Sequence, residues 1–206
     1  MMNAPSPQQA MVPAPSYPLV LQHPHYTVER SFFAILGRTT RVFAPDGQLA
    51  CFIKAKLFSW RQETTLFADE GQTQPFLTMK ARQIVGFNIN HDVFDAASGA
   101  RLGGVQNRGL GFFRDEWNLL DGNDRPVGEM KEVGTVFLRR MFPILRNGKW
   151  DISIGGQVVA QIRERWTMFS KKYDLDLSAN AGRIDPRFAM ACAILALNRE
   201  SAREQR

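Results

Sequence analysis

Residues 185–200 read DPRFAMACAILALNRE, and this stretch decides what kind of fold the chain can adopt. Asp185 followed by Pro186 is a favourable start for a helix, because aspartate caps free backbone N–H groups and proline fits the first helical turn. Every residue from Phe188 to Leu197 is apolar, so the helix has no polar face to turn toward water. Such a helix is either fully buried in protein or lies in a membrane.

The length of the apolar run separates these two alternatives. A bilayer crossing needs about 20 apolar residues, and this run is only half as long and is flanked by Arg187 and Arg199. Its four alanines would let surrounding strands approach closely. We therefore predict a helix over 185–205 that runs through the middle of a closed β-barrel.

The chain before this helix repeats a pattern of strand, turn and strand. Asp-Gly and Gly-Gly turns between β-prone runs are strong hairpin signals, because both turn positions must accept positive φ. No long segment between Glu29 and Leu177 has helical periodicity. The pattern predicts a mainly β fold, an antiparallel meander of about ten strands or more that closes to hide its edges. The turns are centred on Asp46-Gly47, Glu70-Gly71, Ser98-Gly99, Asp121-Gly122 and Gly155-Gly156.

The first 25 residues have a different composition. They contain Pro5, Pro7, Pro13, Pro15, Pro18 and Pro24, and they lack the basic and apolar segments of a secretory signal. We predict that residues 1–25 form a disordered, Pro-rich tail and that residues 26–206 form a single domain. The tail is interpreted as a tether, and a Pro-rich ligand for a protein partner is the alternative.

The overall charge favours an anionic partner. The formal net charge is +6 and the sequence pI is about 9.7, which leaves nucleic acid, an acidic membrane surface and an acidic protein open. Cys51 and Cys192 follow no metal or redox spacing. They fit a reducing, cytoplasmic setting better than a disulfide framework.

Four motifs in a fixed order connect the chain to a known superfamily. They are VFDAASG (93–99) before Leu102-Gly103, RDEW (114–117) before Asp121-Gly122, GEMKE (128–132) and KKYDLDL (171–177). With these motifs, the chain from Tyr26 to Arg199 resembles the tubby C-terminal-like superfamily, and within it the phospholipid scramblase and LURP-one-related families, including their bacterial members.

This resemblance implies a twelve-stranded barrel around a central helix. It also implies a superfamily whose members bind phosphoinositides, are linked to lipid scrambling, or have no known activity. The chain differs from animal scramblases, because it has no cysteine cluster for palmitoylation and its last apolar run does not continue into a full membrane span. Both differences argue against lipid flipping.

Residues 107–117, NRGLGFFRDEW, look like an RNA-recognition signature. Such signatures need aromatic residues at the third, fifth and eighth positions, which here are Leu110, Phe112 and Asp115. Two of the three stacking platforms are missing, and the internal helices of that fold are not predicted. We interpret the stretch as an ordinary strand and do not expect nucleic acid to be a partner.

The sequence offers few groups for catalysis or metal binding. Two of the three histidines, His23 and His25, lie in the predicted tail, and no nucleophile motif is present. We therefore predict a protein that is not an enzyme and has no cofactor. A weak calcium candidate is the trio Asp174, Asp176 and Asp185, but a solvated strand face and a helix cap explain these residues better, because the glycine and glutamate of a calcium loop are missing.

Basic residues recur in pairs on predicted outward strand faces. Each basic residue near an anionic surface contributes about 1 kcal/mol, so converging pairs could bind lipid headgroups. The alternative is an ordinary charged strand face, since four glutamates interleave with the bases. The headgroup candidates are Lys54, Lys56, Lys80, Arg82, Arg139, Arg140, Arg163, Arg165, Lys171 and Lys172.

These observations lead to three functional hypotheses. The first is a non-enzymatic cytoplasmic barrel, peripheral at the membrane, that binds anionic phospholipid headgroups. The second is a protein-interaction adaptor that uses its Pro-rich tail or surface loops. The third is a phospholipid scramblase.

Overall fold

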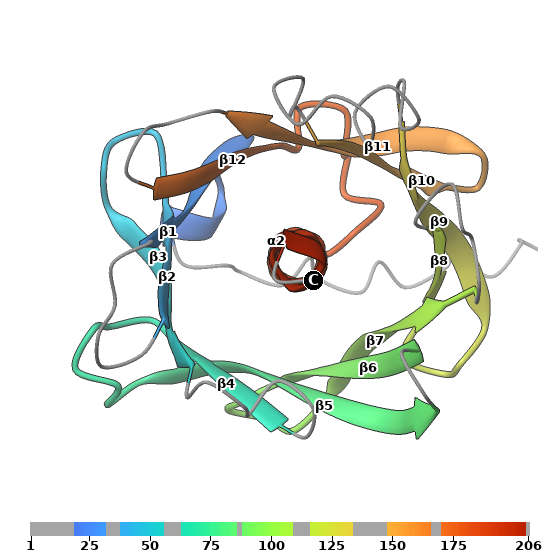
Figure 1. Ribbon diagram of the computed structural model, residues 1–206, viewed down its shortest axis with the longest axis horizontal. Helices are drawn as coiled ribbons and strands as arrows, with labels where there is room; N and C mark the ends of the chain where they lie inside the picture. Colours follow the sequence, from blue (N-terminus) through green and yellow to red (C-terminus); the bar gives the residue numbers. More distant parts are fainter. Residues whose placement is uncertain are drawn as a thin grey trace, which may run out of the picture.

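A computed structural model shows a closed antiparallel β-barrel around one helix (Figure 1). It describes residues 19–31, 38–55, 63–85, 88–108, 116–133, 148–165 and 170–204 of the 206-residue chain. Each strand pairs with the next along the chain, and the first pairs with the last. The strands are β1 (His25–Ser31), β2 (Arg38–Phe43), β3 (Leu49–Ala55), β4 (Glu63–Phe67), β5 (Pro75–Val85), β6 (Asn88–Asp95), β7 (Arg101–Asn107), β8 (Glu116–Leu120), β9 (Pro126–Glu132), β10 (Lys149–Ile154), β11 (Gln157–Arg165) and β12 (Ser170–Asp176). The predicted mainly β barrel is confirmed, with twelve strands.

The helix α2 (Pro186–Glu204) lies at the centre of the ring of strands (Figure 1). Asp185 caps its start, since the backbone N–H of Arg187 donates to the Asp185 carboxylate at 2.8 Å. All residues from Phe188 to Leu197 are buried, which confirms the predicted threading through the barrel. None of the helices in the described part of the chain is long and apolar enough to cross a membrane.

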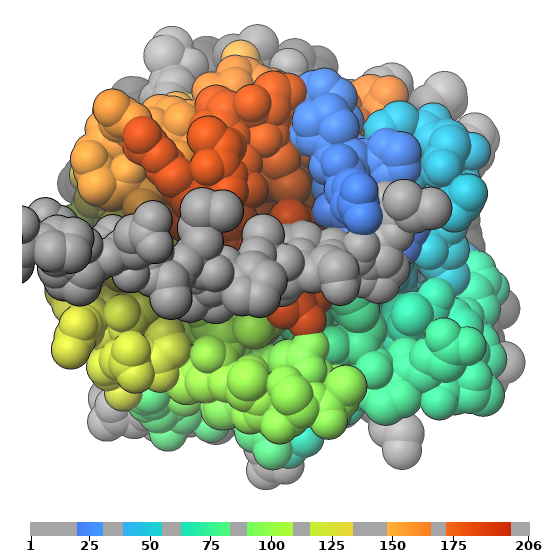
Figure 2. Space-filling view, turned by 180° about the vertical axis from the view of Figure 1, so that it is seen from behind, coloured from blue at the N-terminus to red at the C-terminus, as the bar shows by residue number. Residues whose placement is uncertain are grey.

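The two ends of the barrel differ, and we name them by the direction of α2. The N rim, where α2 begins, carries the short turns at residues 44–48, 68–74, 96–100, 121–125 and 155–156 and the segment 177–185. These turns form the face seen in Figure 2. The C rim, toward which α2 runs, is marked by the strand ends Ser31, Ala55, Val85, Asn107, Glu132 and Arg165.

The turn between β10 and β11 shows why glycine is needed at the N rim. Gly155 and Gly156 both have positive φ, 57° and 80°, as the tightest hairpin turn requires. The predicted hairpin at this position is therefore confirmed by its backbone conformation.

Residues on the N-terminal side of the expected domain boundary at residue 26 pack on the barrel. Residues 19–21 form a short 3-10 helix, η1 (Leu19–Leu21), and Leu21 is only 1% exposed. The backbone N–H of Leu177 donates to the carbonyl of Pro24 at 2.6 Å. Part of the segment expected to be tail is thus packed against the barrel, while residues 1–18 lie outside the described residues.

Candidate functional site: a basic patch near the C rim

Four basic side chains share the outer face of β10, β11 and β12 near the C rim. Arg163 and Arg165 alternate along β11, and Lys149 stands opposite Arg163 at the start of β10. Lys172 stands opposite Arg165 on β12. We call Lys149, Arg163, Arg165 and Lys172 the basic patch. The structure therefore brings together three residues of the predicted headgroup set and adds Lys149, which the sequence reasoning missed.

Lys149 was missed because the sequence reasoning considered only basic residues in pairs, and a β-bulge then determines which residue it faces. A regular hairpin with a two-residue turn at Gly155-Gly156 would place Lys149 opposite Ile162. The register instead shifts by one residue between Ser153 and Ile152, because a bulge inserts one extra residue into β11. This shift moves Lys149 opposite Arg163.

Two members of the basic patch have carboxylate partners. Arg165 Nη2 lies 3.0 Å from Asp174 Oδ1, and Lys172 Nζ lies 3.0 Å from Glu29 Oε2. Both pairs are substantially exposed to solvent. Exposed pairs contribute little stability, so these cations remain able to exchange partners.

The other two members form no ion pair with any described residue. Arg163 donates from Nη2 to Gln161 Oε1 at 2.7 Å, and the Lys149 ammonium has no carboxylate partner among the described residues. Like charges directly opposite each other on neighbouring strands destabilise a sheet. Arg163 also stands opposite Asp174 on β12 and attracts the Asp176 carboxylate without an ion pair. An anion placed between Lys149 and Arg163 would relieve the repulsion between these two cations.

The remaining described headgroup candidates lie on other walls of the barrel. Lys54, on β3, is exposed. Lys80, on β5, pairs with Glu63 at 3.4 Å, and its ammonium lies 5.9 Å from the centroid of the Phe94 ring. In the strand order β5 lies across the barrel from β11 (Figure 1). These residues and the basic patch therefore do not form one continuous surface.

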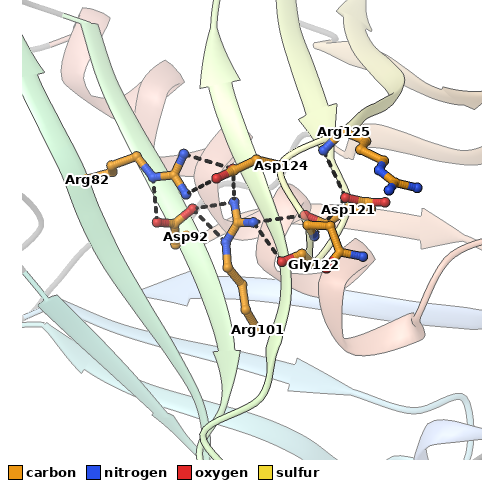
Figure 3. A network of polar contacts seen from close by, with 8 residues as sticks. Arg82, Asp92, Arg101, Asp121, Gly122, Asp124 and Arg125 are labelled. Atoms are coloured by element: carbon orange, nitrogen blue, oxygen red, sulfur yellow. Dashed lines mark hydrogen bonds and ion pairs between the residues drawn. The ribbon is translucent and has the colours of Figure 1, made fainter.

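Arg82 belongs to a neutral network of ion pairs rather than to a surplus of charge (Figure 3). Its guanidinium contacts Asp92 at 2.9 Å and Asp124 at 2.8 Å. Arg101 contacts the same two carboxylates, at 2.7 and 2.8 Å, and donates to the backbone carbonyl of Gly122 at 3.2 Å. Two cations and two anions balance here. The pKa of Asp124 is lowered by the hydrogen bond from Arg82, so the network fixes the β8–β9 turn against the wall.

Three of the headgroup candidates, Lys56, Arg139 and Arg140, lie outside the described residues, as does the 109–115 part of the RNA-like stretch. The backbone of Lys171 is described in β12, in register with Arg30 of β1. The headgroup role of all ten residues stays a prediction.

The calcium candidates are engaged by separate partners. Asp174 contacts Arg165, Asp176 accepts hydrogen bonds from the backbone and side chain of Ser178, and Asp185 caps α2. Within the described ranges, no three or more His, Cys, Asp or Glu side chains group in a way that could hold a metal ion. The three aspartates therefore have structural partners that account for them.

The two cysteines lie in the core and are unpaired. Burial raises the pKa of the Cys192 thiol to about 12, and it also raises the pKa of the Cys51 thiol. A thiol is nucleophilic only as its thiolate, so both side chains are inert packing groups at neutral pH.

The barrel, its central helix and the order of its motifs point to one family. The sequence pattern of the LURP-one-related family matches residues 25–197. The chain belongs to this family. The match confirms the resemblance carried by the sequence motifs. No curated protein matches this LURP-one-related chain in sequence. Among solved structures, an X-ray structure of a protein from Arabidopsis thaliana is 13% identical, covers 87% of this chain and 93% of its own, and aligns with a TM-score of 0.46.

Proposed function

We propose that this LURP-one-related chain is a non-catalytic cytoplasmic protein that docks on anionic membranes and binds lipid headgroup phosphates through the basic patch. The observation that carries the proposal is the group of four cations on β10–β12, two of which form no ion pair with a described residue. A phosphate between Lys149 and Arg163 would receive charge-assisted hydrogen bonds from two groups that otherwise repel each other. The free, buried thiols of both cysteines are consistent with a reducing compartment.

The charge difference between the two rims supports a defined orientation on the membrane. The N rim turns hold five carboxylates and one basic side chain, Arg125, and two of the carboxylates, Glu70 and Asp124, are paired with arginines of the wall. The basic patch lies near the C rim. An anionic surface attracts the basic end and repels the acidic end. The C rim would therefore face the lipid. The acidic residues of the N rim turns are Asp46, Asp69, Glu70, Asp121 and Asp124.

The sequences that connect the strands at the C rim also support this orientation. The segments 32–37, 56–62 and 134–147 begin and end at strand ends on the C rim. They lie outside the described residues, but they contain FFAILG, KLFSWRQ and FLRRMFPILR. Aromatic residues prefer the interface between lipid and water, and interleaved basic residues favour anionic headgroups.

Vesicle co-sedimentation of the full chain tests the proposal. Wild-type protein should sediment with phosphatidylcholine vesicles that contain phosphatidylserine or a phosphoinositide, and not with pure phosphatidylcholine. The double variant Arg163→Gln/Arg165→Gln removes two cations worth about 1 kcal/mol each, so its affinity should fall about 30-fold. High salt should weaken binding of the wild type, because exposed charges are screened.

A matched double variant on the N rim controls for the change in net charge. Arg125 and Arg183 are both exposed and lie in N rim segments, so Arg125→Gln/Arg183→Gln should keep nearly all of the binding. The lipid proposal fails if wild-type protein ignores every vesicle at low salt. The assignment to the basic patch fails if both double variants lose binding equally.

Two alternatives from the same chain have their own readouts. An adaptor that recruits partners through its Pro-rich segment would lose a captured partner when residues 1–18 are deleted, with vesicle binding intact. A scramblase would move fluorescent lipid between the leaflets of reconstituted vesicles. Docking alone would leave the label where it was placed.

A further inference from the structure

Residues 19–25 lie across the N rim, and we call this segment the strap. In Figure 2 it is drawn in blue, between the orange-red residues that follow β12 and the light-blue residues around the β2–β3 turn. Its 3-10 helix η1 packs against β3. Leu21 is buried, and Val20 packs against the core while partly exposed. A short segment held by few contacts is expected to open locally, without unfolding of the whole protein.

The backbone of the strap is joined to the barrel at its C-terminal end. The backbone N–H of Leu177 donates to the carbonyl of Pro24 at 2.6 Å, and His25 pairs with Asp176 of β12. The ladder between β1 and β2 begins at Thr27, beyond the strap. The strap can therefore leave the N rim while the pairing of β1 with β2 stays intact.

Each histidine of the strap faces a carboxylate of a different neighbour. His23 Nε2 lies 3.8 Å from Asp46 Oδ2, in the β2–β3 turn. His25 Nδ1 lies 3.4 Å from Asp176 Oδ1, at the end of β12. Both contacts are ion pairs only when the imidazole is protonated. The strap is thus joined to both neighbours through groups whose charge can change.

The remaining described contacts of the two imidazoles are with neutral groups. The His23 ring lies edge-to-face with the Tyr26 ring, at 6.5 Å between centroids, and the Ser178 hydroxyl lies 3.4 Å from His25 Nε2. Burial opposes ionisation of Asp176, but hydrogen bonds from Ser178 and the nearby positive charges of His25 and Arg163 lower the pKa of its carboxyl. This carboxylate therefore stays charged at mildly acidic pH.

We infer that residues 19–25 form a pH-sensitive strap, which closes on the N rim at mildly acidic pH and opens more often as the pH rises. Histidine changes its charge between about pH 5 and 8, whereas aspartate normally stays ionised there. Protonation therefore adds an ion pair to each neighbour. A group that gains a partner on protonation stabilises the closed state at low pH, and this effect is lost as the pH rises. The strap and the basic patch lie at opposite ends of the barrel, so the inference is independent of the lipid proposal.

Opening of the strap exposes apolar side chains that the closed strap hides. Val20 and Leu21 would leave the core together with η1. The strap therefore makes this part of the chain more accessible to a partner at neutral than at acidic pH.

Amide hydrogen exchange of the full chain tests the inference. The Leu177 N–H is bonded to the Pro24 carbonyl only while the strap is closed, so its protection factor reports closing. Two exposed ion pairs should raise this factor about fivefold between about pH 8 and about pH 5.5. The Asp121 N–H donates to the Arg125 carbonyl in another turn of the same rim. Neither residue contacts a histidine in the described part of the chain, so the protection of Asp121 should change less than about twofold.

Variants assign the effect to the two histidines. The double variant His23→Gln/His25→Gln cannot become charged at these positions, so the pH dependence at Leu177 should disappear, whereas His91→Gln on β6 should keep it. Equal protection of wild-type Leu177 at both pH values, or an unchanged pH dependence in the double variant, would overturn the inference.

A measurement on wild-type protein at high salt remains decisive even if a variant folds poorly. Salt screens exposed ion pairs, so the fivefold effect at Leu177 should shrink to less than about twofold. A pH effect that high salt leaves intact would refute the role of the two ion pairs.

Discussion

Replacing Gly103 by alanine should destabilise the barrel far more than the same change at its neighbour Gly104. The two glycines are adjacent in β7, so they face opposite sides of the wall. On the inner side, a Cβ at Gly103 would lie 2.6 Å from the carbonyl oxygen of Leu120 and 2.9 Å from Cε2 of Phe188. Carbon contacts are optimal at about 3.5–4.0 Å. Neither neighbour can give way easily, because Leu120 is in a paired strand and Phe188 is part of the enclosed helix.

The outer side presents softer neighbours. A Cβ at Gly104 would lie 2.6 Å from Nη2 of Arg101 and 3.1 Å from Oδ1 of Asp92, and both atoms end side chains. Arg101 can swing aside and keep its bond to the Gly122 carbonyl. The change should weaken part of the ion-pair network, at a cost of about 1 kcal/mol.

The two effects can be expressed as melting temperatures. Overpacking at Gly103 costs up to about 3 kcal/mol, and removing a strand glycine returns about 0.5–1 kcal/mol. For a chain of this size, a net loss of about 2 kcal/mol lowers the Tm by about 4–8 °C. For Gly104→Ala the cost in the ion-pair network and the gain from removing a strand glycine nearly cancel, so the Tm should stay close to that of the wild type. Circular dichroism melts of both variants measure the difference. A Tm loss at Gly104→Ala equal to or larger than that at Gly103→Ala would refute the argument from rigid and flexible neighbours.

Three further outcomes follow from the contacts of the described residues. Deleting residues 1–25 removes the buried Leu21, so it should cost at least about 2 kcal/mol in urea unfolding relative to deleting residues 1–18 alone. Hydrogen bonds from Ser98 lower the pKa of Asp95 in the folded protein. The ionised Asp95 carboxylate therefore stabilises the fold above pH ~4, and this stabilisation is lost as the pH falls further. The difference in unfolding free energy between wild type and Asp95→Asn should shrink over that range. Both cysteines are buried, so a thiol reagent should label neither until denaturant unfolds the barrel, and rapid labelling of native protein would contradict the enclosed core.

The fold could be predicted from two features of the sequence, the apolar C-terminal helix and the series of hairpin turns. An apolar helix too short for a bilayer must be enclosed by protein, and the rest of the predicted domain consists of strands joined by Asp-Gly and Gly-Gly turns, so the strands must surround the helix. The boundary of the tail was less predictable. Proline density near Pro24 suggested disorder, yet Leu21 is buried against the barrel, because a single apolar side chain can anchor a segment whose composition is otherwise that of a linker.

Only part of the candidate site could be predicted from the sequence, because the site depends on which strands are neighbours and on their register. Alternation identified Arg163 and Arg165 as a pair on one face, but only strand order shows that Lys172 lies beside them and Lys80 across the barrel. The bulge that brings Lys149 opposite Arg163 leaves no signature in composition. The ion-pair partners could not be predicted either, because nothing in the sequence near Arg82 indicates that Asp124, 42 residues away, neutralises it.

The central helix also determines where any ligand of this protein can bind. In a barrel of this size the interior can be filled by side chains or hold a small ligand, and here α2 fills it with residues that are almost completely buried from Phe188 to Leu197. Recognition must then use the outer wall and the rims. On the wall, most described cations are balanced by carboxylates, as Arg82 and Arg101 are. Lys149 and Arg163 depart from this balance side by side on neighbouring strands, since neither forms an ion pair with a described residue. An anionic ligand on this wall would therefore meet two cations that no described carboxylate already holds.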